Sequence, residues 1–92
     1  MAPRLTLPAP IEIAKSWINR RHDALVVTLQ TWNGRNLVDV RRHAMTRDGK
    51  LVPTGKGLAM AVTRLRDLET AIRLAIKKAE ELNLMNSEGD DE

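Results

Sequence analysis

The chain has no cysteine, tyrosine or phenylalanine, and its only large aromatic side chains are Trp17 and Trp32. Without cysteine there is no disulfide, no thiolate nucleophile and no zinc–cysteine cluster, and the hydrophobic core must be aliphatic. No apolar run approaches the roughly 18 residues of a membrane span, and no basic-then-apolar signal segment opens the chain. We therefore expect a single cytoplasmic domain in these 92 residues.

Catalytic signatures are equally scarce. His22 and His43 are the only histidines, and Asp23 and Asp39 lie near them without a glycine-flanked serine, a paired-carboxylate motif or metal-ligand spacing. The stretch 54–57 lacks the second glycine and the following Ser or Thr of a nucleotide-binding loop, so it is interpreted as a Gly-rich turn. We expect no enzyme activity, no metal and no cofactor.

Positive charge is concentrated before the last six residues. The whole chain carries 15 basic and 12 acidic residues, for a net charge of +3. Four of the acids lie in residues 87–92, so residues 1–86 carry 15 bases against 8 acids, a net +7. A basic block followed by an acidic tail is typical of a chain that meets a polyanion, and solubility alone is the alternative explanation.

Hydrophobic alternation predicts four strands, separated by Asn33-Gly34 and Asp48-Gly49 turns and by a loop over residues 16–23. Three prolines make residues 1–10 an irregular arm, and residues 87–92 are interpreted as a disordered tail around a domain of residues 11–86. The predicted strands cover residues 11–15, 24–32, 36–44 and 51–60, the last as an edge strand.

From about residue 62 the apolar spacing changes to three- and four-residue steps, which predicts a helix of about 22 residues ending near Asn83. Such a helix is too long for one small sheet to cover. A homodimer packed through the helices would bury the excess. The predicted interface comprises Leu65, Leu68, Ile72, Ile76, Ala79 and Leu82. The expected fold class is α+β, a four-stranded curved antiparallel sheet followed by one long C-terminal helix.

Alternation also places Thr28, Gln30 and Trp32 on one sheet face, with Asp39 and Arg41 on the same side of the return strand. An exposed indole beside guanidinium and ammonium groups offers what an unpaired nucleic acid needs, a stacking surface and phosphate partners. The alternative is that Trp32 packs over the hairpin turn as a residue of the core edge.

The sequence contains an ordered series of motifs, Trp32-Asn33-Gly34, Leu37-Val38-Asp39-Val40-Arg41, Gly49, then Pro53-Thr54-Gly55-Lys56-Gly57-Leu58 and a helix. This series resembles the C-terminal single-stranded-DNA-binding domain of the transcriptional coactivator family called positive cofactor four, which also has bacterial members. The resemblance implies a dimer that binds unpaired DNA without sequence specificity across its sheets. It assigns Trp32 to base stacking and Arg35, Arg41 and Lys56 to backbone binding.

The chain departs from the family pattern at two places. Gly55 matches a basic residue, and His43-Ala44 replaces an aromatic pair, so one stacking platform is missing; we hypothesise that Trp17 replaces it. The alternative is that Trp17 plugs the sheet edge. This sequence alone adds further basic residues to the predicted interface: Arg20, Arg21, Arg42, Arg47 and Lys50.

These observations predict a dimeric, sequence-nonspecific single-stranded-DNA-binding protein in transcription regulation or strand protection, with transcription machinery as a further partner and no membrane or small-molecule ligand. A protein-interaction adaptor that docks an acidic partner on the same basic sheet is the alternative, and RNA is another candidate ligand. The acidic tail is also a candidate competitor for the basic sheet.

Overall fold

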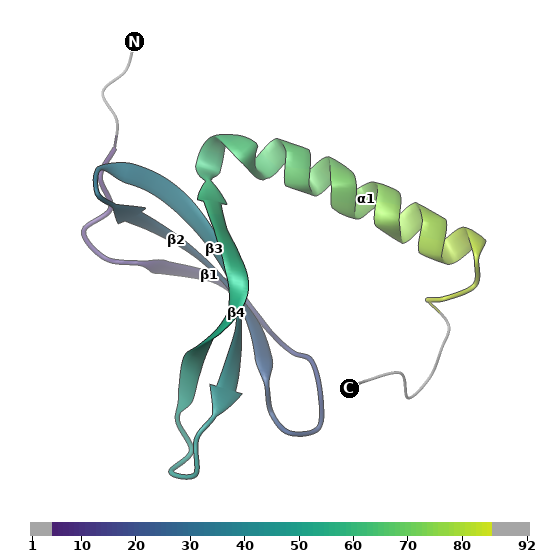
Figure 1. Ribbon diagram of the computed structural model, residues 1–92, viewed down its shortest axis with the longest axis horizontal. Coiled ribbons are helices and arrows are strands. Elements are labelled where there is room, and N and C mark those ends of the chain that lie inside the picture. The colour runs from purple at the N-terminus through teal and green to yellow at the C-terminus, as the bar shows by residue number, and fades with distance from the viewer. Residues whose placement is uncertain (1–4, 86–92) are drawn as a thin grey trace.

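A computed structural model describes residues 5–85, which form one curved antiparallel sheet followed by a helix (Figure 1). The strands β1 (Ile11–Trp17), β2 (Ala24–Trp32), β3 (Arg35–Met45) and β4 (Leu51–Ala61) lie side by side in chain order. A 3₁₀ turn, η1 (Val62–Arg64), leads into α1 (Leu65–Glu81). The predicted fold class is confirmed. Among residues 5–85, no helix has both the length and the apolar character that crossing a membrane takes.

Two elements, β1 and the helix, differ from the predictions by more than one residue at an end. Strand β1 continues through Ser16 and Trp17, which pair with Leu25 and Ala24, so the predicted loop over 16–23 is shorter. The α-helix has 17 residues, because its predicted first turn is the 3₁₀ turn η1 and because Asn83, with φ 60°, stops it. The predicted length of about 22 residues was therefore wrong.

Both predicted hairpin turns are present. Asn33 and Gly34 have φ of 52° and 75°, the pair of positive values that a two-residue turn between twisted strands requires. At the second turn Gly49 has φ 82°, and its N–H donates to the Thr46 carbonyl at 3.0 Å. These turns connect β2, β3 and β4 as antiparallel neighbours.

The register separates the sheet into two faces. On the first, called the tryptophan face, Thr28 lies opposite Asp39 and Val26 opposite Arg41. On the second, called the aliphatic face, Leu29 lies opposite Val38 and Val27 opposite Val40. The predicted placement of the Trp32 row with Asp39 and Arg41 is confirmed by this register.

A single chain buries very little. Among the described residues, the buried hydrophobic side chains are Ala24, Val26 and Val38, and α1 contains none. The helix extends away from the sheet (Figure 1), and the radius of gyration is 15.9 Å, against about 12 Å for a compact domain of this length. The apolar side of the helix and much of the aliphatic face therefore stay in contact with solvent.

The N-terminal arm is anchored at one end of this sheet. The N–H of Leu7 donates to Thr31 Oγ1 at 2.8 Å, and Asn36 Nδ2 donates to the Leu5 carbonyl at 2.8 Å. Thr31 and Asn36 are cross-strand partners next to the β2–β3 turn. Residues 5–10 form no helix or strand, and the acidic tail at 87–92 lies outside the described residues.

Candidate nucleic-acid interface

A groove of about 600 Å³ runs along the tryptophan face. Trp32, 63% exposed, lines it at the β2–β3 turn, and His43 and Pro53 line it toward the other end of the sheet. Trp32 therefore presents its indole to solvent and is not a residue of the core edge. The groove is lined by Pro10, Thr28, Gln30, Trp32, Leu37, Asp39, Arg41, His43, Pro53 and Ala59.

Arg41, in the middle of this groove, is held by its neighbours. Its Nη2 donates to Asp39 Oδ1 at 2.9 Å, its Nε lies 3.1–3.2 Å from both Asp39 oxygens, and its Nη1 donates to the Thr54 carbonyl at 2.9 Å. The hydrogen bond to Asp39, with its negative charge, raises the pKa of Arg41. The pair is electrically neutral, so Arg41 contributes less positive potential to the groove than its sequence suggests.

The contact to Thr54 shows a second role for Arg41, because Thr54 begins an irregularity in β4. The register passes from Arg41 opposite Gly57 to His43 opposite Pro53, so residues 54–56 bulge out opposite Arg42. Thr54 Oγ1 donates to the Arg42 carbonyl at 2.7 Å and accepts the Lys56 N–H at 3.1 Å. Arg41 and Thr54 thus fix the bulge that presents Lys56, which is exposed.

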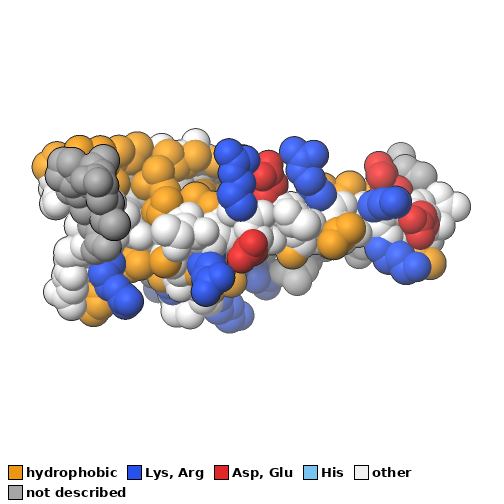
Figure 2. Space-filling model, turned by 90° about the horizontal axis from the view of Figure 1, so that it is seen from above, with side chains coloured by type: hydrophobic (Ala, Val, Ile, Leu, Met, Phe, Trp, Pro, Cys, Tyr) orange, Lys and Arg blue, Asp and Glu red, His pale blue; other side chains and the backbone are white. Residues whose placement is uncertain are grey.

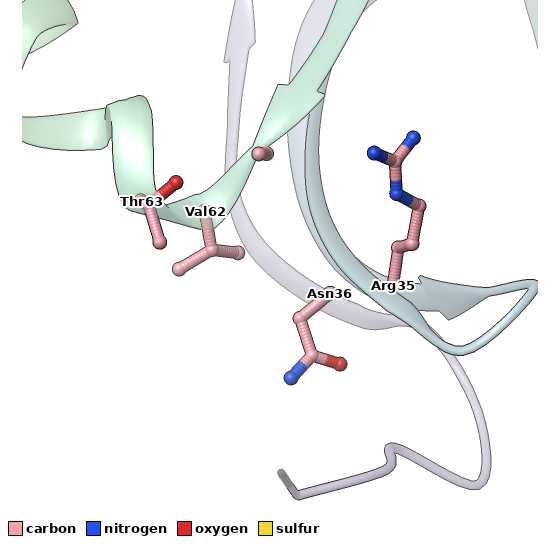
Figure 3. A pocket seen from close by; sticks show the side chains of 5 residues that line it. Arg35, Asn36, Val62 and Thr63 are labelled. Atoms are coloured by element: carbon pink, nitrogen blue, oxygen red, sulfur yellow. The ribbon is translucent and has the colours of Figure 1, made fainter.

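Arg35 lies directly opposite Trp32 across the β2–β3 turn. Figure 3 shows its side chain and that of Asn36 leaving β3 in opposite directions. Asn36 points to the aliphatic face, where it donates to the Leu5 carbonyl of the N-terminal arm. Arg35 therefore lies on the tryptophan face. Both residues line a cavity of about 280 Å³ beside Val62 and Thr63 at the start of η1. The register therefore places a basic residue at the same end of the tryptophan face as Trp32.

Arg42 lies on the other face of the sheet, opposite Leu25. Its Nη2 forms an ion pair of 2.7 Å with Asp23 Oδ2, which also accepts a hydrogen bond from Asn19 Nδ2 at 3.0 Å. The hydrogen bonds from Asn19 and Arg42 lower the pKa of Asp23. The structure thus separates Arg42 from the Trp32 groove and uses it to hold the β1–β2 loop.

The other predicted basic residues lie on connecting segments. Arg20 and Arg21 are in the β1–β2 loop, and Arg47 and Lys50 are in the β3–β4 turn; all four are exposed. Both connections lie at the end of the sheet remote from Trp32 (Figure 1). These residues extend a basic surface beyond the groove and do not line it.

Trp17 ends β1 on the tryptophan face, opposite Ala24, and is 54% exposed. Ala44 follows Val38 and Val40 in alternation on the aliphatic face. Trp17 therefore supplies a ring, but at a different place from the aromatic that the sequence resemblance assigned to position 44.

Sequence reasoning missed Lys15, whose Nζ lies 5.7 Å from the centroid of the Trp17 ring. Lys15 pairs with Val26 on the tryptophan face. The signal was present, since residues 15 and 17 share a face in any strand, but the strand was predicted to end at 15.

The helix contributes no continuous basic face. Figure 2 shows basic side chains beside acidic ones along the helical half of the molecule. Pairs such as Arg73–Glu69 at 3.3 Å and Lys78–Glu81 at 3.7 Å account for this. The predicted interface residues follow one another at three- and four-residue steps along α1, with Leu82 directly after it: Leu65, Leu68, Ile72, Ile76, Ala79 and Leu82.

The family model described as Transcriptional Coactivator p15 (PC4) matches residues 21–71, more than half of the chain. The chain belongs to this PC4 family. The crystal structure of BPSL1147, a PC4 homolog from Burkholderia pseudomallei K96243, is similar, with a TM-score of 0.67 and 25% identity over 77% of this chain and 95% of that chain. A comparison with curated proteins gives no match. The family is known for a transcriptional coactivator role and single-stranded-DNA binding, and the resemblance inferred from the sequence is confirmed.

Gly55 offers a direct test of the bulge as a phosphate contact. A Cβ added there meets no atom within 4 Å, and the backbone does not require glycine. We expect Gly55→Lys to tighten binding of oligo-dT and to steepen the slope of log K against log salt concentration by about 0.7. Gly55→Gln, similar in length and uncharged, serves as the control. An unchanged slope for the lysine variant would show that strands do not pass the bulge.

Proposed function

We propose that this PC4-family protein is a sequence-nonspecific single-stranded-DNA-binding, coactivator-like homodimer that holds unpaired strands in the groove of the tryptophan face. The observation that carries the proposal is the exposed Trp32 at the end of that groove with Arg35 directly opposite. Such an arrangement combines a stacking surface for any base with a phosphate partner. The protein performs no chemistry on the strand and acts in the cytoplasm.

Phosphate binding is distributed along the groove. Arg35 and Lys15 are exposed on the tryptophan face, and Lys56 is presented by the bulge. Of the five N–H groups of Arg41, three are used by Asp39 and Thr54, which leaves one on Nη1 and one on Nη2 for a phosphate oxygen. These contacts release counterions, so binding should weaken steadily as salt increases.

Dimerisation is supported by what a single chain leaves uncovered. Ile72 and Ile76 are exposed large hydrophobic residues on one side of α1, and Leu25 and Leu58 are exposed on the aliphatic face. Since large apolar patches mark association surfaces, a second copy packed against the helix supplies the missing core. The two tryptophan faces then remain available for nucleic acid.

The test of the proposal is replacement of Trp32. Trp32→Ala should weaken oligo-dT binding by about 5- to 150-fold, because stacking one base contributes roughly 1–3 kcal/mol. The salt slope should stay the same, because no phosphate contact is lost. Trp32→Phe keeps a stacking ring and should retain most of the affinity. Fluorescence anisotropy of labelled oligo-dT at two salt concentrations measures both quantities.

Parallel titrations separate the alternatives. Equal affinity for oligo-dT and the matching RNA would show that both nucleic acids are ligands, since stacking tolerates either sugar. Absence of binding to any unpaired strand at low salt would refute the proposal and favour a protein adaptor that docks an acidic partner. Tighter binding of the matching duplex would also count against it.

A further inference from the structure

We propose that Trp17 and His43 form a second base-stacking subsite for unpaired nucleobases, at the opposite end of the tryptophan face from Trp32. The inference rests on the proposed function and adds a ligand-binding place to it. Its basis is a row of side chains in direct register across the sheet, Trp17–Ala24–His43–Pro53, all on the tryptophan face.

The middle of this row is a buried alanine. Ala24, fully buried, is the only residue between Trp17 and His43 in the row, and its side chain is a single methyl group. Neighbouring strands are about 4.8 Å apart, so the backbones of Trp17 and His43 lie roughly 10 Å apart across β2. Because Ala24 is completely covered by its neighbours, a base stacks on the outward surface of the Trp17 ring, which is 54% exposed, and does not enter between the two rings.

Contacts in the β1–β2 loop hold the Trp17 ring in place. His22, with φ 66°, meets the indole edge to face with the two ring centroids 5.7 Å apart and the planes at 88°. The loop is closed by the Asn19–Asp23 hydrogen bonds and by the Arg42–Asp23 ion pair. A ring positioned before the ligand arrives loses little conformational entropy on binding.

Lys15 adds the charge that such a subsite needs. Its ammonium lies 5.7 Å from the Trp17 ring centroid in a cation–π arrangement. Because a lysine side chain is long and flexible, a base can displace the ammonium from the ring while the charge stays within reach of the adjoining phosphate. An exposed indole, a neighbouring imidazole and a mobile cation together match the requirements of an unpaired nucleotide.

The position of the row also gives the length of strand that one protomer holds. Trp32 and Ala24 are the two ends of β2, so the Trp32 and Trp17 subsites are separated by eight strand steps, or about 26 Å along the strand. A stacked strand rises 3.4 Å per nucleotide, so one protomer spans at most roughly eight nucleotides. A twelve-nucleotide oligo-dT therefore reaches both subsites.

Single-tryptophan variants test this inference directly. The chain has two tryptophans and no tyrosine, so Trp17 is the sole fluorophore excited at long wavelength in Trp32→Phe, and Trp32 is the sole one in Trp17→Phe. Each variant is titrated with dT12 while anisotropy of a labelled dT12 records binding separately. We expect Trp17 emission to be quenched as Trp32→Phe binds. Binding by anisotropy with unchanged Trp17 emission overturns the inference.

Affinity provides the second measurement. Trp17→Ala should weaken dT12 binding at least about fivefold, and Trp17→Phe should restore it to within about twofold of the wild-type value. Wild-type affinity for Trp17→Ala overturns the second subsite while leaving the proposed function intact, provided that Trp32 is still quenched in that variant. If the wild type binds no dT12 and the Trp32 emission of Trp17→Phe does not change during the titration, the proposed function itself is refuted.

Discussion

Replacing Gly57 with alanine is expected to lower the free energy of unfolding by about 3 kcal/mol. A Cβ at this position would lie 2.5 Å from the Val40 carbonyl oxygen and 2.7 Å from the Arg41 Cα. Both are backbone atoms of the central strand β3, so no side-chain rotation relieves the clash and β4 must move away. For a domain of this size the midpoint of thermal unfolding should fall by roughly 12–24 °C.

The matched control is two residues away. A Cβ at Gly55 meets nothing within 4 Å and its φ is not positive, so Gly55→Ala should change stability by no more than about 0.5–1 kcal/mol. Thermal unfolding followed by circular dichroism at equal protein concentration compares the two variants. Equal midpoints for Gly57→Ala and Gly55→Ala would contradict the close approach of β3 and β4. A clear difference would explain why glycine follows Lys56.

The bulge beside Gly57 also illustrates what sequence patterns can and cannot predict. The alternation of apolar residues in β2 and the Asn33-Gly34 turn are local signals, and together they determine which residues of β2 and β3 face each other. Trp32, Asp39 and Arg41 were placed on one face for this reason. The neutralisation of Arg41 by Asp39 and Thr54 depends on side-chain geometry, so composition suggested a free cation where the structure has a paired one.

The end of β1 depends on contacts distant in sequence. The register with β2 shifts between Glu12 and Ala14, and the strand then continues to Trp17 because β2 supplies partners as far as Ala24. Local alternation broke at Ser16, so Trp17 was assigned to a loop. The same limit applies to the first turn of the helix, where the apolar spacing of Val62 and Leu65 suits a 3₁₀ turn as well as an α-helix.

The placement of Arg42 in the predicted interface has a different cause, because its neighbours in the sequence already indicated the face of the sheet on which it lies. It follows Val38 and Val40 at two-residue steps, which places it on the aliphatic face in any regular strand. Its partner Asp23 lies 19 residues away, and only the folded register brings the two together. The predicted interface included Arg42 because positive charges were counted without regard to the face of the strand on which each residue lies.

Substituting Ile72 with aspartate is expected to dissociate the proposed dimer and to unfold the chain at micromolar concentration. Ile72 is a large hydrophobic residue, 49% exposed, on the apolar side of α1. A carboxylate buried there without a partner loses its hydration, which costs several kcal/mol. The dimer dissociation constant should rise at least 100-fold, and sedimentation equilibrium measures it.

Leu74 provides the matched control on the same helix. It is 61% exposed, and the 100° step per residue places it about 160° around the helix axis from Ile72. Leu74→Asp makes the same chemical change outside the apolar stripe, so it should remain dimeric and melt close to the wild-type midpoint. If both variants stay dimeric, the apolar side of α1 is not the interface.

Dimer dissociation and unfolding should occur together in the Ile72 variant because the separate chain has so little to hold it. With Ala24, Val26 and Val38 as the buried hydrophobic side chains of its described residues, a protomer lacks the core that offsets the conformational entropy of folding. The wild-type melting midpoint should accordingly rise with protein concentration, as mass action requires of a coupled dimer. A melting midpoint that does not depend on concentration, combined with a monomeric mass, would show instead that the single chain is stable alone. The exposed apolar side of the helix would then be a surface for a partner other than a second copy.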